Sequence, residues 1–171
     1  MRRLGACQRG GALIEFTVVA PLLLLLFLGS YVYFDALTVS RKVTITARTV
    51  ADLTSRSSSV TTSGMATIMG ASAQVLWPYS SANAGLRVSE VQVATATTAT
   101  VIWSQAQNTT IRATSSTVTI PANLAATGSY LILGEVTYAY TAPVSFRGLS
   151  SMALQQAIYM SPRVSNSVPL S

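Results

Sequence analysis

Acid–base and metal chemistry need clusters of titratable side chains, and this sequence holds few of them. Its 171 residues contain no His and a single Cys, Cys7, so an imidazole base, an imidazole metal ligand and an intrachain disulfide are all excluded. The carboxylates lie far apart along the chain, at Glu15, Asp35, Asp52, Glu90 and Glu135. Any Ser–Lys nucleophile would have to use Lys42, the only Lys. We therefore expect no enzyme, no metal site and no cofactor.

The net charge of +6 does not indicate a nucleic-acid partner. Three of the eleven basic residues lie within residues 1–10, and without that segment 8 basic minus 5 acidic residues leave a net charge of +3. Among the remaining basic residues only Arg41, Lys42 and Arg48 come close together. Nucleic-acid binders concentrate their basic side chains in one patch. We therefore expect no nucleic-acid partner.

Residues 16–34 read FTVVAPLLLLLFLGSYVYF and contain no charged side chain. A helix over this range is about as long as the hydrocarbon core of a bilayer is thick, about 30 Å. Tyr31 and Tyr33 stand near its end and Arg41 and Lys42 follow it, as expected of residues at a membrane–water interface. A removable secretory signal is the alternative, but its apolar core would be shorter and a small-x-small cleavage site would follow. We expect a transmembrane helix.

A carboxylate stands at the start of this apolar segment. Glu15 directly precedes Phe16, and Pro21 follows about a turn and a half later, where it would kink a helix or free a carbonyl group. An ionised carboxylate at the edge of the lipid is costly and usually has a partner. The helix N-terminus and headgroup water could stabilise Glu15 by themselves. These residues alone leave open whether another chain supplies the partner.

The segment that begins at Gly10 resembles the opening of the TadE-like family. Gly10 is followed by four residues, by EFTVVAP at positions 15–21 and by a Leu-rich run, and the basic leader ending in Gly is similar to a class III prepilin signal. TadE-like proteins are pilin-like minor subunits, or pseudopilins, of tight-adherence (Tad/Flp) pilus systems. Thr17 replaces the usual small apolar residue. The acidic residue that commonly closes the membrane helix is displaced here to Asp35.

The resemblance implies one processing step and one assembly step. A prepilin peptidase would cut on the cytoplasmic side between Gly10 and Gly11. Glu15 would then neutralise the new amino terminus of a neighbouring subunit, because the paired charges cost less in lipid than either charge alone. Glu15 would set the register between subunits, supported by Phe16 and Pro21.

The resemblance also implies a location and a set of partners. The chain would cross the bacterial inner membrane once, with its N-terminus in the cytoplasm and its head outside; the count of basic residues does not decide this orientation. Its partners would be the membrane, the prepilin peptidase, Tad platform proteins and other pilin or pseudopilin subunits. It would act as a minor pilin in assembly of a Tad-type (type IVc) pilus for surface adherence. The alternative is a single-pass anchored binding module outside the cytoplasm that does not polymerise. Weaker resemblance extends to residues 118–121, 134–140 and 159–163.

Periodicity predicts the elements that hold these residues. Apolar side chains recur on one helical face at Val39, Val43, Ala47, Val50 and Leu53. We therefore expect one helix over residues 12–56, with its first half in lipid and its second half packed on a head. A second helix is predicted over residues 65–76, where Trp77-Pro78 would end it. Residues 104–129, rich in Ser, Thr, Ala and Asn, are expected to form an exposed loop or surface hairpin.

Strand signals follow the second predicted helix. We expect strands over residues 86–93, where the alternation slips once, over 100–105 and over 130–140. Residues 153–160 would form a last strand or a short helix. The predicted fold is α+β and pilin-like: a long N-terminal helix, membrane-spanning in its first half, packed on a small antiparallel sheet. The chain would divide into a cleaved basic leader (1–10), a transmembrane helix (11–35) and an extracytoplasmic α+β head domain (36–171).

Overall fold

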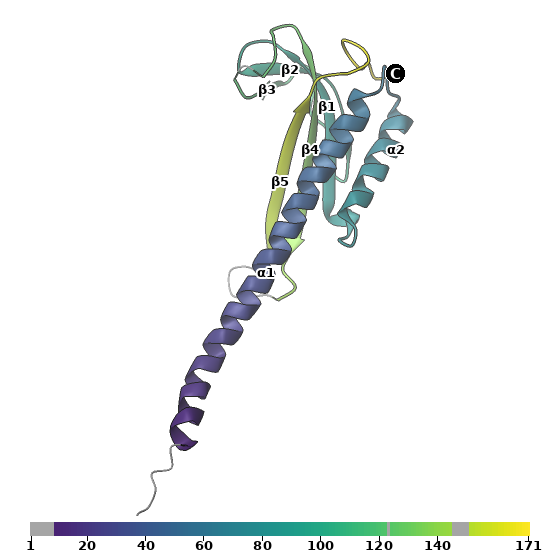
Figure 1. Cartoon of the computed structure of the whole chain (residues 1–171). Helices are drawn as coiled ribbons and strands as arrows, with labels where there is room; N and C mark the ends of the chain where they lie inside the picture. Colours follow the sequence, from purple (N-terminus) through teal and green to yellow (C-terminus); the bar gives the residue numbers. More distant parts are fainter. Residues whose placement is uncertain (1–8, 123, 145–150) are drawn as a thin grey trace, which may run out of the picture.

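One long helix and a five-stranded sheet make up the fold. The structure is a computed structural model and describes residues 9–122, 124–144 and 151–171. Residues 1–8 of the predicted leader, Cys7 among them, lie outside the described residues. Figure 1 shows a head at one end of the long helix, whose other end extends beyond it as a stalk. The elements are α1 (Arg9–Ser55), α2 (Thr62–Ala73), η1 (Gln74–Leu76), η2 (Ser81–Asn83), β1 (Ala84–Val93), β2 (Thr98–Gln107), β3 (Thr117–Thr119), β4 (Tyr130–Thr141) and β5 (Ser151–Met160).

The two halves of α1 have opposite surroundings. The half within the head contributes five fully buried apolar side chains: Val39, Val43, Ala47, Val50 and Ala51. The prediction of Leu53 in this face is wrong, because Leu53 is 38% exposed. At 3.6 residues per turn the buried face continues from Val50 to Ala51 and Thr54, which leaves position 53 on the outer side. Thr54 is buried because its hydroxyl donates a hydrogen bond to the Val50 carbonyl at 2.8 Å.

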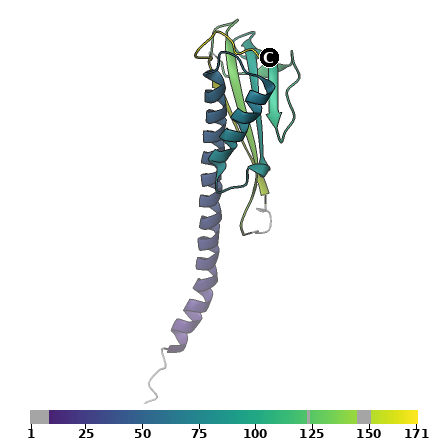
Figure 2. The ribbon, with the colours of Figure 1, turned by 90° about the vertical axis from the view of Figure 1, so that its right-hand side faces the viewer.

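The sheet is antiparallel, with strand order β3-β2-β1-β4-β5. Both α1 and α2 cover the same face of it, α1 against β4 and β5 and α2 beside α1 (Figures 1 and 2). Gly134 of β4 permits this close approach: a Cβ atom there would lie 2.8 Å from the Ala47 carbonyl oxygen. The α+β arrangement of a long apolar N-terminal helix on an antiparallel sheet is thereby confirmed.

The opposite face of the sheet carries a second, smaller core. Leu131 and Leu133 of β4 point away from the helices and pack with Val91 and other buried residues of β1 and β2. β3 and the chain after it cover this core through Val118 and Ile120, which are 7% and 3% exposed. Residues 104–129 are expected to form an exposed loop or surface hairpin, and β3 does pair antiparallel with β2, of which residues 104–107 are part. The expected exposure is wrong at Val118 and Ile120, whose apolar side chains are buried.

Local features of the sequence explain where the other predicted elements agree with the structure and where they differ from it. The slip in apolar alternation over residues 86–93 arises because Leu86 and Val88 pack in the core under the helices, whereas Val91 and Val93 pack in the second core. The β-bulge at this level lies in β2, where Ile102 has no partner between Val101, paired with Val91, and Trp103, paired with Glu90. α2 begins at Thr62, three residues before the predicted start, because the Thr61 hydroxyl accepts a hydrogen bond from the Gly64 N–H at 3.0 Å and caps the helix. Residues 151–160 form a strand, which resolves the alternative left open for 153–160.

The C-terminal segment closes the top of the head. Glu90, 1% exposed, accepts hydrogen bonds from the Val168 N–H at 2.6 Å and from the Trp103 indole N–H at 3.0 Å. Burial raises the pKa of Glu90, although both donors favour the charged form. A parallel bridge joins Val60 to Leu170. The chain end is thus fixed against the α1–α2 connection.

Candidate functional site

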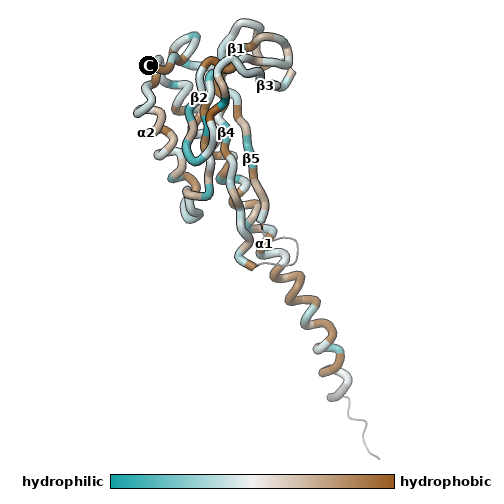
Figure 3. Tube along the Cα trace, turned by 180° about the vertical axis from the view of Figure 1, so that it is seen from behind, coloured by the Kyte–Doolittle hydropathy of each residue, from teal (hydrophilic) through white to brown (hydrophobic). Residues whose placement is uncertain are grey.

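The half of α1 outside the head presents a continuous apolar surface. Eleven of its large apolar side chains are between 46% and 72% exposed: Leu13, Ile14, Phe16, Val18, Val19, Leu22, Leu23, Leu24, Leu25, Leu26 and Phe27. Figure 3 shows this stalk as mostly hydrophobic. Soluble monomers rarely expose so large a contiguous apolar area. Among the described residues, α1 is the one helix long and apolar enough to cross a membrane, and its apolar window has no buried residues.

The predicted cleavage and register residues lie at the far end of this surface. Gly10 and Gly11 are in the first turn of α1, and Glu15 lies one turn further along, on the same side of the helix as Gly11. Glu15 and Phe16 are both exposed. The first turn of a helix has N–H groups without helical partners, so Gly10–Gly11 can be extended by unwinding that turn alone. Gly11, on the C-terminal side of the predicted cut, is exposed like the carboxylate of Glu15.

Pro21 interrupts the hydrogen bonding of this half. It lies inside α1 and has no N–H to donate to the carbonyl of Thr17. The Thr17 hydroxyl donates instead to the Leu13 carbonyl at 2.7 Å. Figure 2 shows α1 bending toward its N-terminal end. A proline in this half of the helix accounts for such a bend.

Asp35 connects α1 to the head where the two halves of the helix meet. The Tyr79 hydroxyl, after η1, donates to one oxygen of Asp35 at 2.7 Å. The Tyr140 hydroxyl, on β4, donates to the other oxygen at 2.7 Å. The Asp35 bond, followed by burial, raises the pKa of Tyr79 to about 12. Burial, followed by the Asp35 bond, also raises the pKa of Tyr140, so both phenols are neutral donors at physiological pH.

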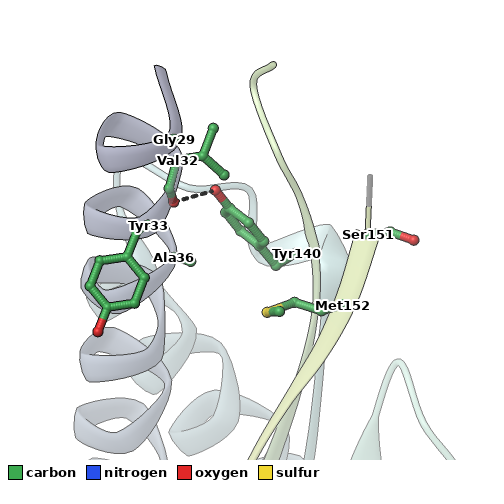
Figure 4. Close-up of a pocket in the computed structure, with 7 residues that line it drawn as sticks. All are labelled: Gly29, Val32, Tyr33, Ala36, Tyr140, Ser151 and Met152. Atoms are coloured by element: carbon green, nitrogen blue, oxygen red, sulfur yellow. Dashed lines mark hydrogen bonds between the residues drawn. The ribbon is translucent and has the colours of Figure 1, made fainter. Parts of the chain in front are cut away.

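A small apolar cavity lies next to this junction, between α1 and the ends of β4 and β5. Its volume is about 370 Å³, and it is lined by Gly29, Val32, Tyr33, Ala36, Tyr140, Ser151 and Met152. Figure 4 shows Tyr140 pointing from β4 toward α1, with its hydroxyl 3.5 Å from the Val32 carbonyl oxygen, and Tyr33 pointing away from the sheet. The small side chains of Gly29 and Ala36 leave this space open. Close packing of α1 on the sheet therefore begins above the cavity.

Of the residues predicted at the membrane–water interface, three are exposed and Lys42 is hydrogen-bonded within the head. Tyr31, Tyr33 and Arg41 are exposed. The ring of Tyr33 lies edge to face with that of Phe34, with 6.0 Å between the ring centroids. The Lys42 ammonium instead donates to the carbonyls of Val75 at 3.3 Å and Trp77 at 2.7 Å. Lys42 thus fixes the turn after η1 against α1, a contact across 35 residues that periodicity does not predict.

The sequence alone also does not predict an ion cluster on the second face of the sheet. Arg87 of β1 and Arg112 of the loop between β2 and β3 both donate hydrogen bonds to Glu135 of β4, at distances of 2.7 to 2.9 Å. Burial alone would raise the pKa of Glu135, but the bonds from Arg112 and Arg87 hold it below its usual range. Arg87 is directly opposite Glu135 in the strand register, whereas no local signal places Arg112 there. The cluster holds the loop around Arg112 on the sheet.

The two features that stand out among the described residues are an apolar surface and a junction between that surface and the head. Within the described ranges no three His, Cys, Asp or Glu side chains gather as a group that could hold a metal ion. The exposed apolar half of α1, with Glu15 near its start and Asp35 at its end, is the candidate functional site. No family model, no curated protein and no solved structure matches this chain.

Proposed function

We propose that this chain is a minor pilin or pseudopilin of a Tad-type pilus, anchored in the bacterial inner membrane by the exposed half of α1. In this proposal a prepilin peptidase cuts between Gly10 and Gly11 on the cytoplasmic side, and the head stands outside the cytoplasm. The apolar halves of several α1 helices then pack side by side. The platform proteins of the pilus system draw the anchored subunits into the assembly.

A single observation supports the proposal most directly. α1 is one helix: one half contributes to the core of the head, and from Gly11 to Phe34 the other half carries no charged side chain apart from Glu15. Lipid can cover that surface before assembly and neighbouring helices can cover it afterwards. Helices associate in a membrane through close packing and polar contacts, so one accessible carboxylate provides a specific contact in an otherwise uniform surface.

Glu15 has a defined role in this mechanism. After the cut Gly11 carries a new α-amino group, and Glu15 of another subunit accepts its hydrogen bonds. An ammonium and a carboxylate that meet in a low-dielectric bundle lose less solvation free energy as a pair than apart. Because all other positions from Gly11 to Phe34 are uncharged, this pair fixes the axial position of each subunit.

The identity of the N-terminal residue tests the processing step. The chain is extracted from membranes of cells with and without the prepilin peptidase, and its intact mass and terminal peptide are measured. We expect a chain that starts at Gly11 only where the peptidase is present. A chain that retains residues 1–10 in both cells contradicts the proposal and favours the anchored binding module. A start beyond Ser30 identifies a secreted domain.

Glu15→Gln tests the assembly step, with Glu15→Asp as the matched control that keeps the charge. We expect Glu15→Gln to insert and to be cut like the original chain, but to be depleted about tenfold from sheared fibres, the equivalent of about 1.4 kcal/mol. Glu15→Asp should retain part of the incorporation. Immunoblots of the membrane and fibre fractions measure the ratio. Equal incorporation of all three chains would show that Glu15 has no role in register.

A further inference from the structure

The two tryptophans of the chain have opposite environments. Trp103 is 7% exposed, and its indole N–H donates to Glu90 at 3.0 Å and to the Val168 carbonyl at 2.8 Å. Trp77 is 77% exposed. A side chain of this size usually buries its apolar ring and bonds its N–H. The head itself gives Trp77 no such cover.

Two contacts fix Trp77 at a known level along α1. The Lys42 ammonium donates to the Trp77 carbonyl at 2.7 Å, and the hydroxyl of nearby Tyr79 donates to Asp35 at 2.7 Å. The turn at residues 77–79 therefore lies beside the stretch of α1 from Asp35 to Lys42, which is about 10 Å long. Asp35 directly follows the apolar segment 16–34. Figure 1 shows this turn, after α2, at the end of the head that faces the stalk.

Other exposed apolar side chains lie at the same end of the head. Tyr33 and Phe34 are 62% and 66% exposed on α1, and Met152 is 47% exposed where β5 begins. Figure 1 shows α1 leaving the head between the α2 side and the β4–β5 side. We call Tyr33, Phe34, Trp77 and Met152 the lower rim. The rim borders α1 at the point where its continuous apolar surface begins.

We propose that the lower rim lies against the membrane surface, with the Trp77 indole at the lipid–water interface as a second contact besides the anchor helix. The occupant follows from continuity, because the bilayer that covers residues 16–34 ends within a few residues of the rim. The interfacial zone on each side of the hydrocarbon core is roughly 5–8 Å thick, about the reach of an indole side chain. Tryptophan favours this zone because its ring is apolar and its N–H finds headgroup or water partners.

The second contact has a mechanical consequence. A single helix lets a head tilt and rotate above the bilayer, whereas a rim contact to one side restricts both movements. Lys42 and Asp35 serve as positioning residues, because they hold the Trp77 turn against α1 without facing the lipid themselves. The inference depends on the membrane anchor in the proposed function, but not on cleavage or fibre assembly.

Lipid-borne quenchers test the rim contact on the full chain. The protein and its Trp77→Phe variant are reconstituted in phosphatidylcholine vesicles whose acyl chains carry bromine near the headgroup, and fluorescence is compared with that in unbrominated vesicles. We expect bromine to remove up to about half of the original chain's emission, because one of the two tryptophans is at the interface. Trp77→Phe, which retains only buried Trp103, should lose much less.

Three results separate the possibilities. Bromine quenching that disappears in Trp77→Phe supports the rim contact. If vesicles carry the protein in flotation but bromine quenches neither chain, and aqueous iodide quenches Trp77 freely, the rim contact is wrong while the anchor stands; Trp77 then faces solvent or another protein. Protein that does not float with vesicles overturns the anchor of the proposed function and the rim contact together. The unchanged emission maximum of Trp103 verifies that the variant is folded.

Discussion

At the scale of single residues, Asp35 is the point where the apolar half of α1 meets the head. A carboxylate that follows an apolar segment would be poorly solvated without partners. Two phenols supply them, one on each oxygen, from Tyr79 and Tyr140. These contacts join residues 44 and 105 positions apart, so the fold must be complete before they form. The sequence marks Asp35 as the end of the apolar segment but does not indicate its partners.

The titration of the tyrosines tests this junction. The pKa of Tyr79 is raised from 10.0 to about 12, so between these pH values the folded chain keeps a proton that the unfolded chain has lost. The junction's contribution to the free energy of unfolding is therefore complete below pH 10 and is lost as the pH rises toward 12. In Asp35→Asn the pKa of Tyr79 should move back toward 10.0, as measured by tyrosinate absorbance.

The control for that titration is Tyr79→Phe, which removes the shifted phenol and keeps the Asp35–Tyr140 bond. Asp35→Asn should also lower the free energy of unfolding by about 1–2 kcal/mol, because the amide N–H₂ group faces a phenol that is itself a donor. Identical titration curves for the original chain and Asp35→Asn would show that the carboxylate does not govern Tyr79.

At the scale of elements, the sequence predicts what depends on local periodicity. The 3.6-residue recurrence from Val39 to Val50 identifies the packed half of α1, and the slipped alternation before Val93 marks where the apolar residues of β1 change from one core to the other. Both features arise from neighbouring residues, so a single sequence contains them. The fold class follows from the order of these elements.

Other features depend on residues that are distant in the chain. Ala51 and Leu53 both suit an apolar face, but Ala51 lies on the side of α1 that packs on Gly134 of β4, whereas Leu53 is 38% exposed. β3 consists of Thr117–Thr119, whose alternation of exposed and buried side chains is too short to identify a strand by itself, and it pairs with the edge that β2 offers. In the candidate site the apolar surface and Glu15 are visible in the sequence, whereas Trp77 is placed by Lys42, 35 residues away.

Gly134 tests how closely α1 packs on the sheet. An added Cβ would lie 2.8 Å from the Ala47 carbonyl oxygen and 3.0 Å from the Ala51 Cβ, so α1 would have to move. We expect Gly134→Ala to lower the free energy of unfolding by about 1–3 kcal/mol. Gly70→Ala is the matched control, because a Cβ in α2 meets nothing within 4 Å and should stabilise the helix by about 0.5–1 kcal/mol.

Chemical denaturation of the full chain in detergent, followed by Trp103 fluorescence, measures both glycine variants. The expected result is a change of opposite sign for the two substitutions. If Gly134→Ala is as stable as the original chain, α1 and β4 have room between them, and Gly134 is not required for the contact.

At the scale of the whole molecule, the two halves of α1 lie in different environments, and few interactions connect the stalk to the core of the head. The fully buried residues of the head begin at Val39, and Val32 and Ala36 pack only partly against its core. The stalk before Gly29 contributes no residue to either core cluster. Its apolar surface therefore adds nothing to the packing of the isolated head, and in the proposed function its burial in lipid or against other helices would be a separate source of free energy.

Two truncations test this division. A chain of residues 30–171 keeps Asp35 and every fully buried side chain of α1, so we expect a soluble head with a cooperative thermal transition. A chain of residues 45–171 loses Val39 and Val43, both 0% exposed, and about 1.5–3 kcal/mol of burial free energy for each. It also loses the Asp35 and Lys42 contacts. Because a domain is stable by only about 5–15 kcal/mol, this second chain should be unfolded or aggregated.

Circular dichroism during heating distinguishes the two truncated chains. If residues 45–171 fold as well as residues 30–171, the packed half of α1 is not part of the head's core. If residues 30–171 fail to fold, the stalk stabilises the head in a way that its exposed side chains do not indicate.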